Sequence, residues 1–127
     1  MQTLVPAEAA PWAAVAVQHL PATLAAWPWA LVEFWARDCL FSRLLKPTRV
    51  ALAQRAAPGL VLLRCEIQVD DPVPAAWGAD AIPVLVLFNH GQRRCRWVGD
   101  MHWSLVLRGT SRHMGTPAQA VAPEGAA

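Results

Sequence analysis

Three runs of apolar residues stand out along the chain, and each predicts a strand that is buried on both faces of a sheet. They cover residues 30–35, 60–67 and 84–88, and the first carries one carboxylate, Glu33. Continuous apolar runs of this length are typical of central strands rather than of strands with one solvated face. A more polar segment, residues 93–98, follows the turn sequence of residues 89–92. This arrangement predicts an antiparallel hairpin.

The segments around these strands predict helices. An Ala- and Leu-rich stretch begins near Pro11, which is tolerated in a first helical turn, and Pro21 is expected to kink or split the helix. A later helix should bend at Pro47 and end at Pro58-Gly59. The predicted helices cover residues 11–26, 42–57, a short stretch within 70–78, and 101–107.

The order of these elements predicts an α/β fold. Strands separated by helices pair in parallel through right-handed crossovers, and the hairpin adds an antiparallel edge. We therefore expect a central mixed sheet of four to five strands, flanked by helices on both faces, with residues 3–5 as a candidate further strand. Residues 1–108 form the predicted domain. Residues 109–127 lack periodicity and are rich in Gly, Pro, Ala, Ser and Thr, which predicts a disordered C-terminal tail.

Composition narrows the possible functions. With 127 residues, the chain is the size of one domain, and 55% hydrophobic against 16% charged residues excludes an intrinsically disordered protein. A net charge of +2 argues against nucleic-acid and polybasic membrane partners, and prolines interrupt the stretches that might span a bilayer. No Lys or Arg precedes Arg37, so the charged part of a signal peptide is missing. We expect a cytoplasmic monomer.

Three cysteines are the candidate reactive groups. Cys39 lies where the first apolar run passes into a helix, and helix N-termini stabilise thiolate over thiol. Cys65 lies within an apolar run and is predicted to be a core thiol. Cys95 lies on the outer strand of the hairpin, where either an exposed or a buried thiol is compatible with the sequence. The Cys and His residues show neither C-x-x-C nor paired-ligand spacing. We therefore predict no metal and no cofactor.

Four segments carry a resemblance to a known family. Residues 32–42 read V-E-F-W-A-x-x-C-x-x-S, Pro47 follows five residues later, residues 81–91 read A-I-P-V-L-V-L-F-N-H-G, and Val98-Gly99 comes after them. In order and spacing these segments resemble the thioredoxin family over roughly residues 27–108. The resemblance implies a thioredoxin fold in which Cys39 is the nucleophile and Glu33 the buried acid beneath it. Arg64 falls near a strand lysine that pairs with that acid.

The same resemblance implies a substrate-binding surface. Pro83 falls at the family's cis-proline, and the loop that holds it pairs with extended substrate backbone. The implied contacts are Ile82 and Pro83 together with Trp35 and Trp77. For Trp77, a place at the rim of the groove and a simple packing role both remain open.

This chain departs from the family pattern at the reactive site. Ser42 replaces the resolving cysteine, Leu40-Phe41 replaces Gly-Pro, and Asp38, whose charge opposes a neighbouring thiolate, replaces the usual tryptophan. The C-x-F-S pattern is similar to that of monothiol glutaredoxins, although the rest of the chain resembles thioredoxin, so their iron–sulfur cluster is not implied.

Two functions follow from this pattern. The first is thiol–disulfide exchange through a single catalytic cysteine, with Cys39 attacking, Ser42 as a hydrogen-bond donor and Glu33 as a proton acceptor. Its partners are protein thiols or disulfides, with glutathione as a further candidate. The alternative is a redox-inactive binding or chaperone module that uses the same groove.

Overall fold

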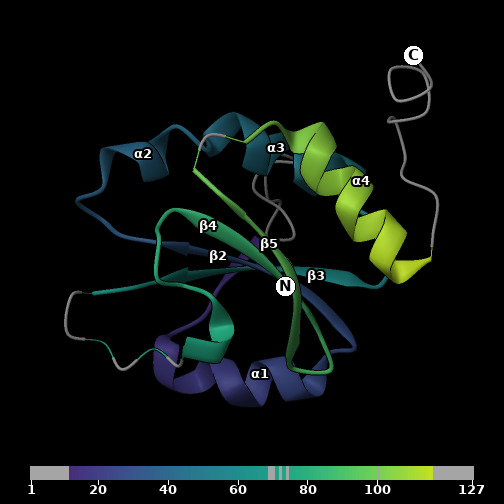
Figure 1. Cartoon of the computed structure of the whole chain (residues 1–127), viewed down its shortest axis with the longest axis horizontal. Coiled ribbons are helices and arrows are strands. Elements are labelled where there is room, and N and C mark those ends of the chain that lie inside the picture. Colours follow the sequence, from purple (N-terminus) through teal and green to yellow (C-terminus); the bar gives the residue numbers. More distant parts are fainter. Residues whose placement is uncertain (1–11, 69–70, 72, 74, 100, 116–127) are drawn as a thin grey trace, which may run out of the picture.

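The structure, a computed structural model, describes residues 12–68, 71, 73, 75–99 and 101–115. The candidate strand at residues 3–5 and residues 116–127 of the predicted tail lie outside these described residues. The described part folds as one central sheet with helices on both faces (Figure 1).

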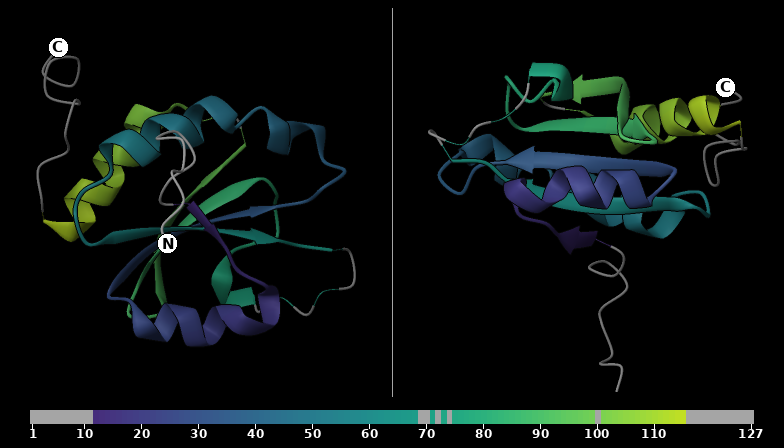
Figure 2. Two further views of the ribbon diagram at one scale, coloured as in Figure 1. Left: turned by 180° about the vertical axis from the view of Figure 1, so that it is seen from behind. Right: turned by 90° about the horizontal axis from the view of Figure 1, so that it is seen from below.

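The sheet has five strands in the order β1-β3-β2-β4-β5. β3 pairs in parallel with both β1 and β2, while β4 is antiparallel to β2 and β5 is antiparallel to β4. Figure 2 shows β1 at one edge of the sheet and the β4–β5 hairpin at the other. The predicted mixed sheet is therefore confirmed. The strands are β1 (Trp12–Ala14), β2 (Trp29–Trp35), β3 (Leu60–Glu66), β4 (Val84–Asn89) and β5 (Gln92–Val98).

The helices divide into two layers (Figure 1), and each layer covers one half of the core. Side chains alternate along a strand, so Val32 and Phe34 of β2 face α1 and η2, while Leu31 and Glu33 face α3. The helical elements are η1 (Val17–His19), α1 (Leu20–Ala26), α2 (Leu40–Arg43), α3 (Lys46–Arg55), η2 (Ala75–Trp77) and α4 (Trp103–Met114).

Pro21 was expected to kink or split its helix and Pro47 to bend one, and both lie in first helical turns. The split alternative agrees with the separate η1 and α1. Pro21 is in the first turn of α1 and Pro47 in the first turn of α3, where the missing N–H has no intrahelical partner to lose. The prediction of one helix over residues 11–26 is wrong at its start, because Trp12–Ala14 pairs with Leu62, Leu63 and Arg64 as an edge strand. The predicted helix over residues 42–57 is present as α3 but is wrong at its start, because α2 and α3 are separate helices.

The last helix extends beyond its predicted end. α4 runs to Met114 and closes at Gly115, whose φ of 76° is the left-handed conformation common after helices. The predicted tail is therefore wrong over residues 109–114. Gly109 was interpreted as the start of the tail, whereas in the structure it lies inside the helix against the indole of Trp97 on β5. A glycine here permits close packing between helix and sheet.

We expect Gly109→Ala to destabilise the protein by about 1–3 kcal/mol, because the added Cβ would collide with the Trp97 ring. In a helix without such a neighbour the same change would stabilise by roughly 0.5–1 kcal/mol. Urea denaturation measures the difference. Arg108→Ala, at the exposed neighbouring position, is the control and should change stability by less than about 0.5 kcal/mol. A stabilising Gly109→Ala would contradict the close packing.

Candidate functional site

Cys39 lies at the junction between a strand and a helix, as the sequence predicts. β2 ends at Trp35, three residues follow, and Cys39 is the N-cap residue of α2. The Cys39 N–H donates to the Ala36 carbonyl at 3.1 Å, and the Ser42 N–H donates to the Cys39 carbonyl at 3.1 Å. These bonds fix the backbone on both sides of a thiol that is free and partly exposed.

The environment of Cys39 favours the thiolate. The backbone N–H of Ser42 lowers the pKa of the Cys39 thiol below its ordinary value, and the Ser42 hydroxyl and the Phe41 N–H add to this effect. Partial burial acts in the opposite direction. Ser42 itself is buried, and its hydroxyl oxygen accepts a hydrogen bond from the Ala36 N–H at 3.4 Å. The serine at this position therefore lowers the pKa of the Cys39 thiol, although it cannot form a disulfide.

The other two thiols differ from Cys39. Cys65 is buried in the core, as predicted, and burial raises its pKa to about 11. Cys95 is partly buried on β5, and burial raises its pKa as well. Because the thiolate is the nucleophile, Cys39 is the best suited of the three to attack a disulfide at neutral pH.

The Ile82–Pro83 segment lies at the same end of the sheet as Cys39. The peptide bond between these residues is cis. Phe34 pairs with Val84, so Pro83 lies next to the end of β2 that leads to the thiol. The Pro83 carbonyl accepts a hydrogen bond from Gly99, whereas the backbone of Ile82 makes no hydrogen bond to another described residue. Ile82 therefore keeps backbone groups that could pair with an extended peptide.

The two tryptophans of the predicted substrate surface have different environments. Trp35 is partly exposed, and the Arg64 guanidinium lies 4.3 Å from its ring centroid. Trp77 is only 8% exposed and stacks on Phe34 with ring centroids 5.9 Å apart. The ring of Trp77 is therefore used for packing in the core, and its contact with a substrate stays a prediction.

Glu33 is fully buried and is held by two arginines. Arg64 donates through Nε to Oε1 at 3.0 Å, which agrees with the predicted pairing. Arg49 of α3 donates through Nη1 to both carboxylate oxygens, at 3.2 and 3.1 Å. These contacts satisfy the carboxylate, and the proton-acceptor role of Glu33 stays a prediction.

Sequence reasoning missed Arg49. Its position carried a signal, because Arg49 lies between Leu45 and Leu52 at helical spacing on one apolar stripe. An arginine within such a stripe requires a buried partner. Glu33, the buried acid already paired with Arg64 by the resemblance, was the available carboxylate.

Three large apolar side chains are exposed beside the thiol. Leu40, Phe41 and Leu44 are 64%, 63% and 60% exposed. Two of them occupy the positions at which the sequence departs from Gly-Pro. Their exposure gives the chain around the partly exposed Cys39 an apolar surface suited to an apolar partner.

The described residues hold no cluster of three or more His, Cys, Asp or Glu side chains placed to bind a metal ion. Among the same residues, none of the helices has the length and apolar character needed to cross a membrane.

Comparisons with known proteins give one family. The family model described as Thioredoxin matches residues 15–106. The thioredoxin of Rickettsia bellii is 29% identical over 69 residues, which is 54% of this chain and 66% of that protein. Thioredoxin 1 of Synechococcus elongatus is 26% identical over 66% of this chain and 78% of its own length. The match thus spans just under two thirds of the Rickettsia protein.

Solved structures agree in fold. A point mutant of a thioredoxin from Halobacterium salinarum superposes with a TM-score of 0.68 at 20% identity, over 87% of this chain and 95% of the other. Mitochondrial thioredoxin 3 from Saccharomyces cerevisiae gives a TM-score of 0.67 at 16% identity, over 84% of this chain and 99% of the other. At these identities the likeness is one of fold.

Proposed function

Because this chain belongs to the thioredoxin family, we propose that it carries out thiol–disulfide exchange with protein partners through Cys39 as its single nucleophile. The observation that carries the proposal is the lowered pKa of the partly exposed Cys39 thiol, caused first by the Ser42 N–H. The cis Ile82–Pro83 segment at the same end of the sheet supports it, because it offers backbone groups beside the thiol.

The exchange has two steps. The Cys39 thiolate attacks one sulfur of a partner disulfide, a mixed disulfide forms, and the second partner sulfur leaves as a thiolate that takes a proton from water. A second thiol must then attack the partner sulfur of the mixed disulfide and release Cys39. With serine at position 42, that thiol has to come from the partner itself, from glutathione or from another protein.

The source of the second thiol sets the outcome. Attack by another thiol of the same partner rearranges its disulfides without net oxidation. Attack by glutathione leaves a glutathionylated partner, which a second glutathione reduces with formation of glutathione disulfide. The proposed activity therefore includes isomerisation. It includes deglutathionylation where the substrate is a glutathionylated protein: Cys39 attacks the glutathione sulfur, the protein thiolate leaves, and a further glutathione frees Cys39 with formation of glutathione disulfide. Both reactions need a compartment with reduced thiols, as in the cytoplasm.

We expect Cys39 to be alkylated by iodoacetamide at lower pH than the other thiols, because its thiolate forms at lower pH. The rate at Cys39 should reach its plateau below the pH of an ordinary thiol. Cys95 should require higher pH, and Cys65, with a pKa of about 11, should stay unmodified near neutrality. Peptide-resolved mass spectrometry measures all three rates in one sample.

Ser42→Ala is the matched variant for this measurement. It removes the hydroxyl and keeps the backbone N–H, so the Cys39 midpoint should rise while staying below that of an ordinary thiol. A wild-type Cys39 that titrates like a free cysteine would contradict the proposed chemistry.

The exposed side chains of Leu40, Phe41 and Leu44 favour a second candidate function, a binding or chaperone module. Such a module would hold an apolar partner segment at this surface without bond exchange. It differs from the first function in a simple way, since it does not require the Cys39 sulfur.

A further inference from the structure

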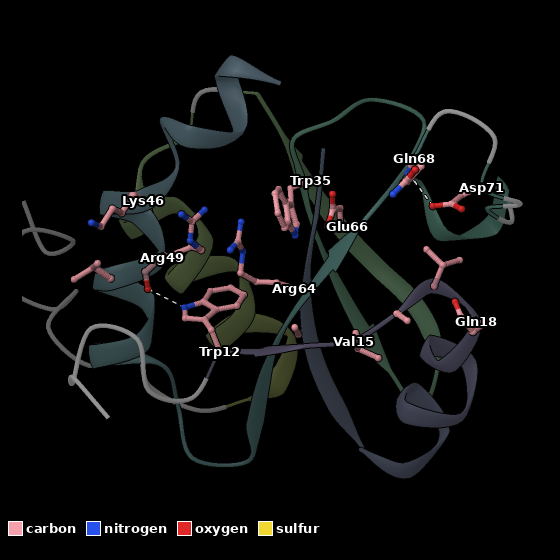
Figure 3. A pocket seen from close by; sticks show the side chains of 14 residues that line it. Trp12, Val15, Gln18, Trp35, Lys46, Arg49, Arg64, Glu66, Gln68 and Asp71 are labelled. Carbon is pink, nitrogen blue, oxygen red and sulfur yellow. Dashed lines mark hydrogen bonds between the residues drawn. The ribbon is translucent and has the colours of Figure 1, made fainter. Parts of the chain in front are cut away.

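A cavity of about 680 Å³ lies beside the sheet, away from the residues assigned above to the exchange site except for Trp35. Its size is within the range of about 300–1,000 Å³ that is usual for small-molecule sites. Figure 3 shows its lining side chains, with Lys46 and Arg49 of α3 on one side and Gln68 and Asp71 on the other. Neither Cys39 nor Pro83 lines it.

The cavity occupies a favourable place in the fold. It is lined by the ends of β2 and β3, at Trp35 and Glu66, and by the segment that follows β1. The chain leaves β2 toward the layer of α3 and leaves β3 toward the layer of η2. Open α/β sheets bind ligands where connections from neighbouring parallel strands diverge in this way.

One side of the cavity has an excess of positive charge. Lys46, Arg49 and Arg64 line it, and the nearby Glu33 is the carboxylate that both arginines contact. Among the described residues Lys46 makes no ion pair. Glu33 therefore balances only part of this charge.

The arginines also keep donors available. Arg49 uses Nη1 toward Glu33 and Arg64 uses Nε, and no other side-chain donation by these two residues to a described residue is present. Each guanidinium has five N–H groups in a planar fork that matches carboxylate and phosphate oxygens. Figure 3 shows the two guanidinium groups next to each other, with that of Arg64 on the side of Trp35.

The acidic groups on the opposite side already have partners. Glu66 is paired with Arg37 at 3.1 Å, and the Asp71 carboxylate accepts the Gln68 N–H at 2.7 Å. The Gln68 N–H is neutral, so Asp71 keeps its negative charge, which lies on the side of the cavity opposite to Lys46 and Arg49. On their side, Lys46, Arg49 and Arg64 carry three positive charges against the one negative charge of Glu33, so an excess of positive charge remains there.

The indole rings of Trp12 and Trp35 line the cavity beside these positive charges. The Trp12 indole is held in place because its N–H donates to the Arg49 carbonyl at 2.9 Å. Arg64 lies over one face of the Trp35 ring, so it can stack while its remaining N–H groups bind an anion. Val50 contributes an apolar surface.

The geometry points to a binding site for a small organic anion, in which a carboxylate or phosphate contacts Arg49, Arg64 and Lys46 and a flat apolar ring packs against Trp12. This site is separate from the disulfide chemistry of Cys39 and does not depend on it.

The test uses the full chain and four probes: 2-naphthoate, 2-naphthyl phosphate, inorganic phosphate, and the neutral 2-naphthamide. Two-dimensional ¹H–¹⁵N spectra report on the indole N–H groups. We expect the naphthyl anions to shift the Trp12 and Trp35 signals, with dissociation constants of about 1 mM or lower. The Trp97 and Trp103 indoles, which do not line the cavity, serve as internal references.

The amide should bind at least about tenfold more weakly than the naphthoate, because it lacks the charge that strengthens hydrogen bonds to arginine. Inorganic phosphate should also bind more weakly than naphthyl phosphate, since it has no ring. If 2-naphthoate binds and 2-naphthyl phosphate does not, the site selects carboxylates, and the reverse result selects phosphates. Either outcome supports an anion site.

Lys46→Gln should weaken binding of the naphthyl anions by about threefold, as expected for an exposed charge. Arg108→Gln, which makes the same change in net charge on α4 outside the cavity, should leave binding unchanged. Equal binding of the amide would overturn the proposal. So would shifts confined to Trp97 and Trp103, or no shift at probe concentrations up to about 10 mM.

Discussion

Cys39→Ser will abolish formation of mixed disulfides. Of the chain's three thiols, Cys39 is the one whose pKa is lowered, whereas burial raises the pKa of Cys65 and Cys95. The reaction with glutathione disulfide, followed by intact mass spectrometry at neutral pH, measures the loss. We expect the wild-type protein to form an adduct and the variant to form none, because serine is not ionised at this pH and cannot form the sulfur–sulfur bond.

The matched control is Cys95→Ser, which removes a partly buried thiol on the far hairpin strand. It should keep the full extent of adduct formation. If Cys39→Ser still formed adducts, or if Cys95→Ser lost them, Cys39 would not be the thiol that reacts.

The same variant separates the two candidate functions. If Cys39→Ser still suppresses aggregation of an unfolded substrate protein as well as the wild type does, while wild-type Cys39 shows no exchange, the binding module is supported. If exchange is present in the wild type and lost in the variant, the enzymatic function is supported.

Glu33→Ala will destabilise the protein by about 3–5 kcal/mol, a large part of the roughly 5–15 kcal/mol that stabilises a typical domain. Glu33 is fully buried, and its removal leaves Arg49 and Arg64 without their carboxylate. Their side chains are only 16% and 27% exposed, so water replaces the lost partner incompletely. The urea denaturation midpoint, with unchanged slope, measures the loss.

Glu66→Ala is the matched control, because Glu66 also pairs with an arginine, Arg37, at 3.1 Å. That arginine side chain is 76% exposed, and solvent screens such pairs. Its removal should therefore change stability much less. Similar midpoints for Glu33→Ala and Glu66→Ala would show that the buried ion pairs do not stabilise the fold as argued.

The central strands show how much of the fold could be predicted. Their apolar runs define β2, β3 and β4 to within a residue or two, because strands buried on both faces have apolar side chains at most positions. The edge strand β1 could not be recognised in the same way. Its three residues, Trp12–Ala14, have helix-compatible alanines, and only pairing with β3 makes them a strand.

The prolines and glycines restricted the local backbone conformation, but they did not show whether each residue lies at the start, inside or at the end of a helix. Pro21 and Pro47 restrict the backbone in ways that suit a bend and a first turn equally well, and the neighbouring elements decide between the two. Gly109 could end a helix or allow a close approach. The position of Trp97 on β5, twelve residues earlier, decides this.

The sequence by itself, through its resemblance to the thioredoxin family, indicated Cys39 as the candidate nucleophile, Ser42 in place of a second cysteine, Glu33 as a buried acid and Pro83 as the neighbouring proline, because motifs of residue type and spacing carry that resemblance. Only the tertiary structure decided that Trp77 packs on Phe34, that Arg49 joins Arg64 on Glu33, and that these arginines face a cavity with Trp12. Each of these contacts joins residues distant in the chain. Sequence pattern reports which side chains must be buried, whereas the packing of helices on the sheet selects their neighbours.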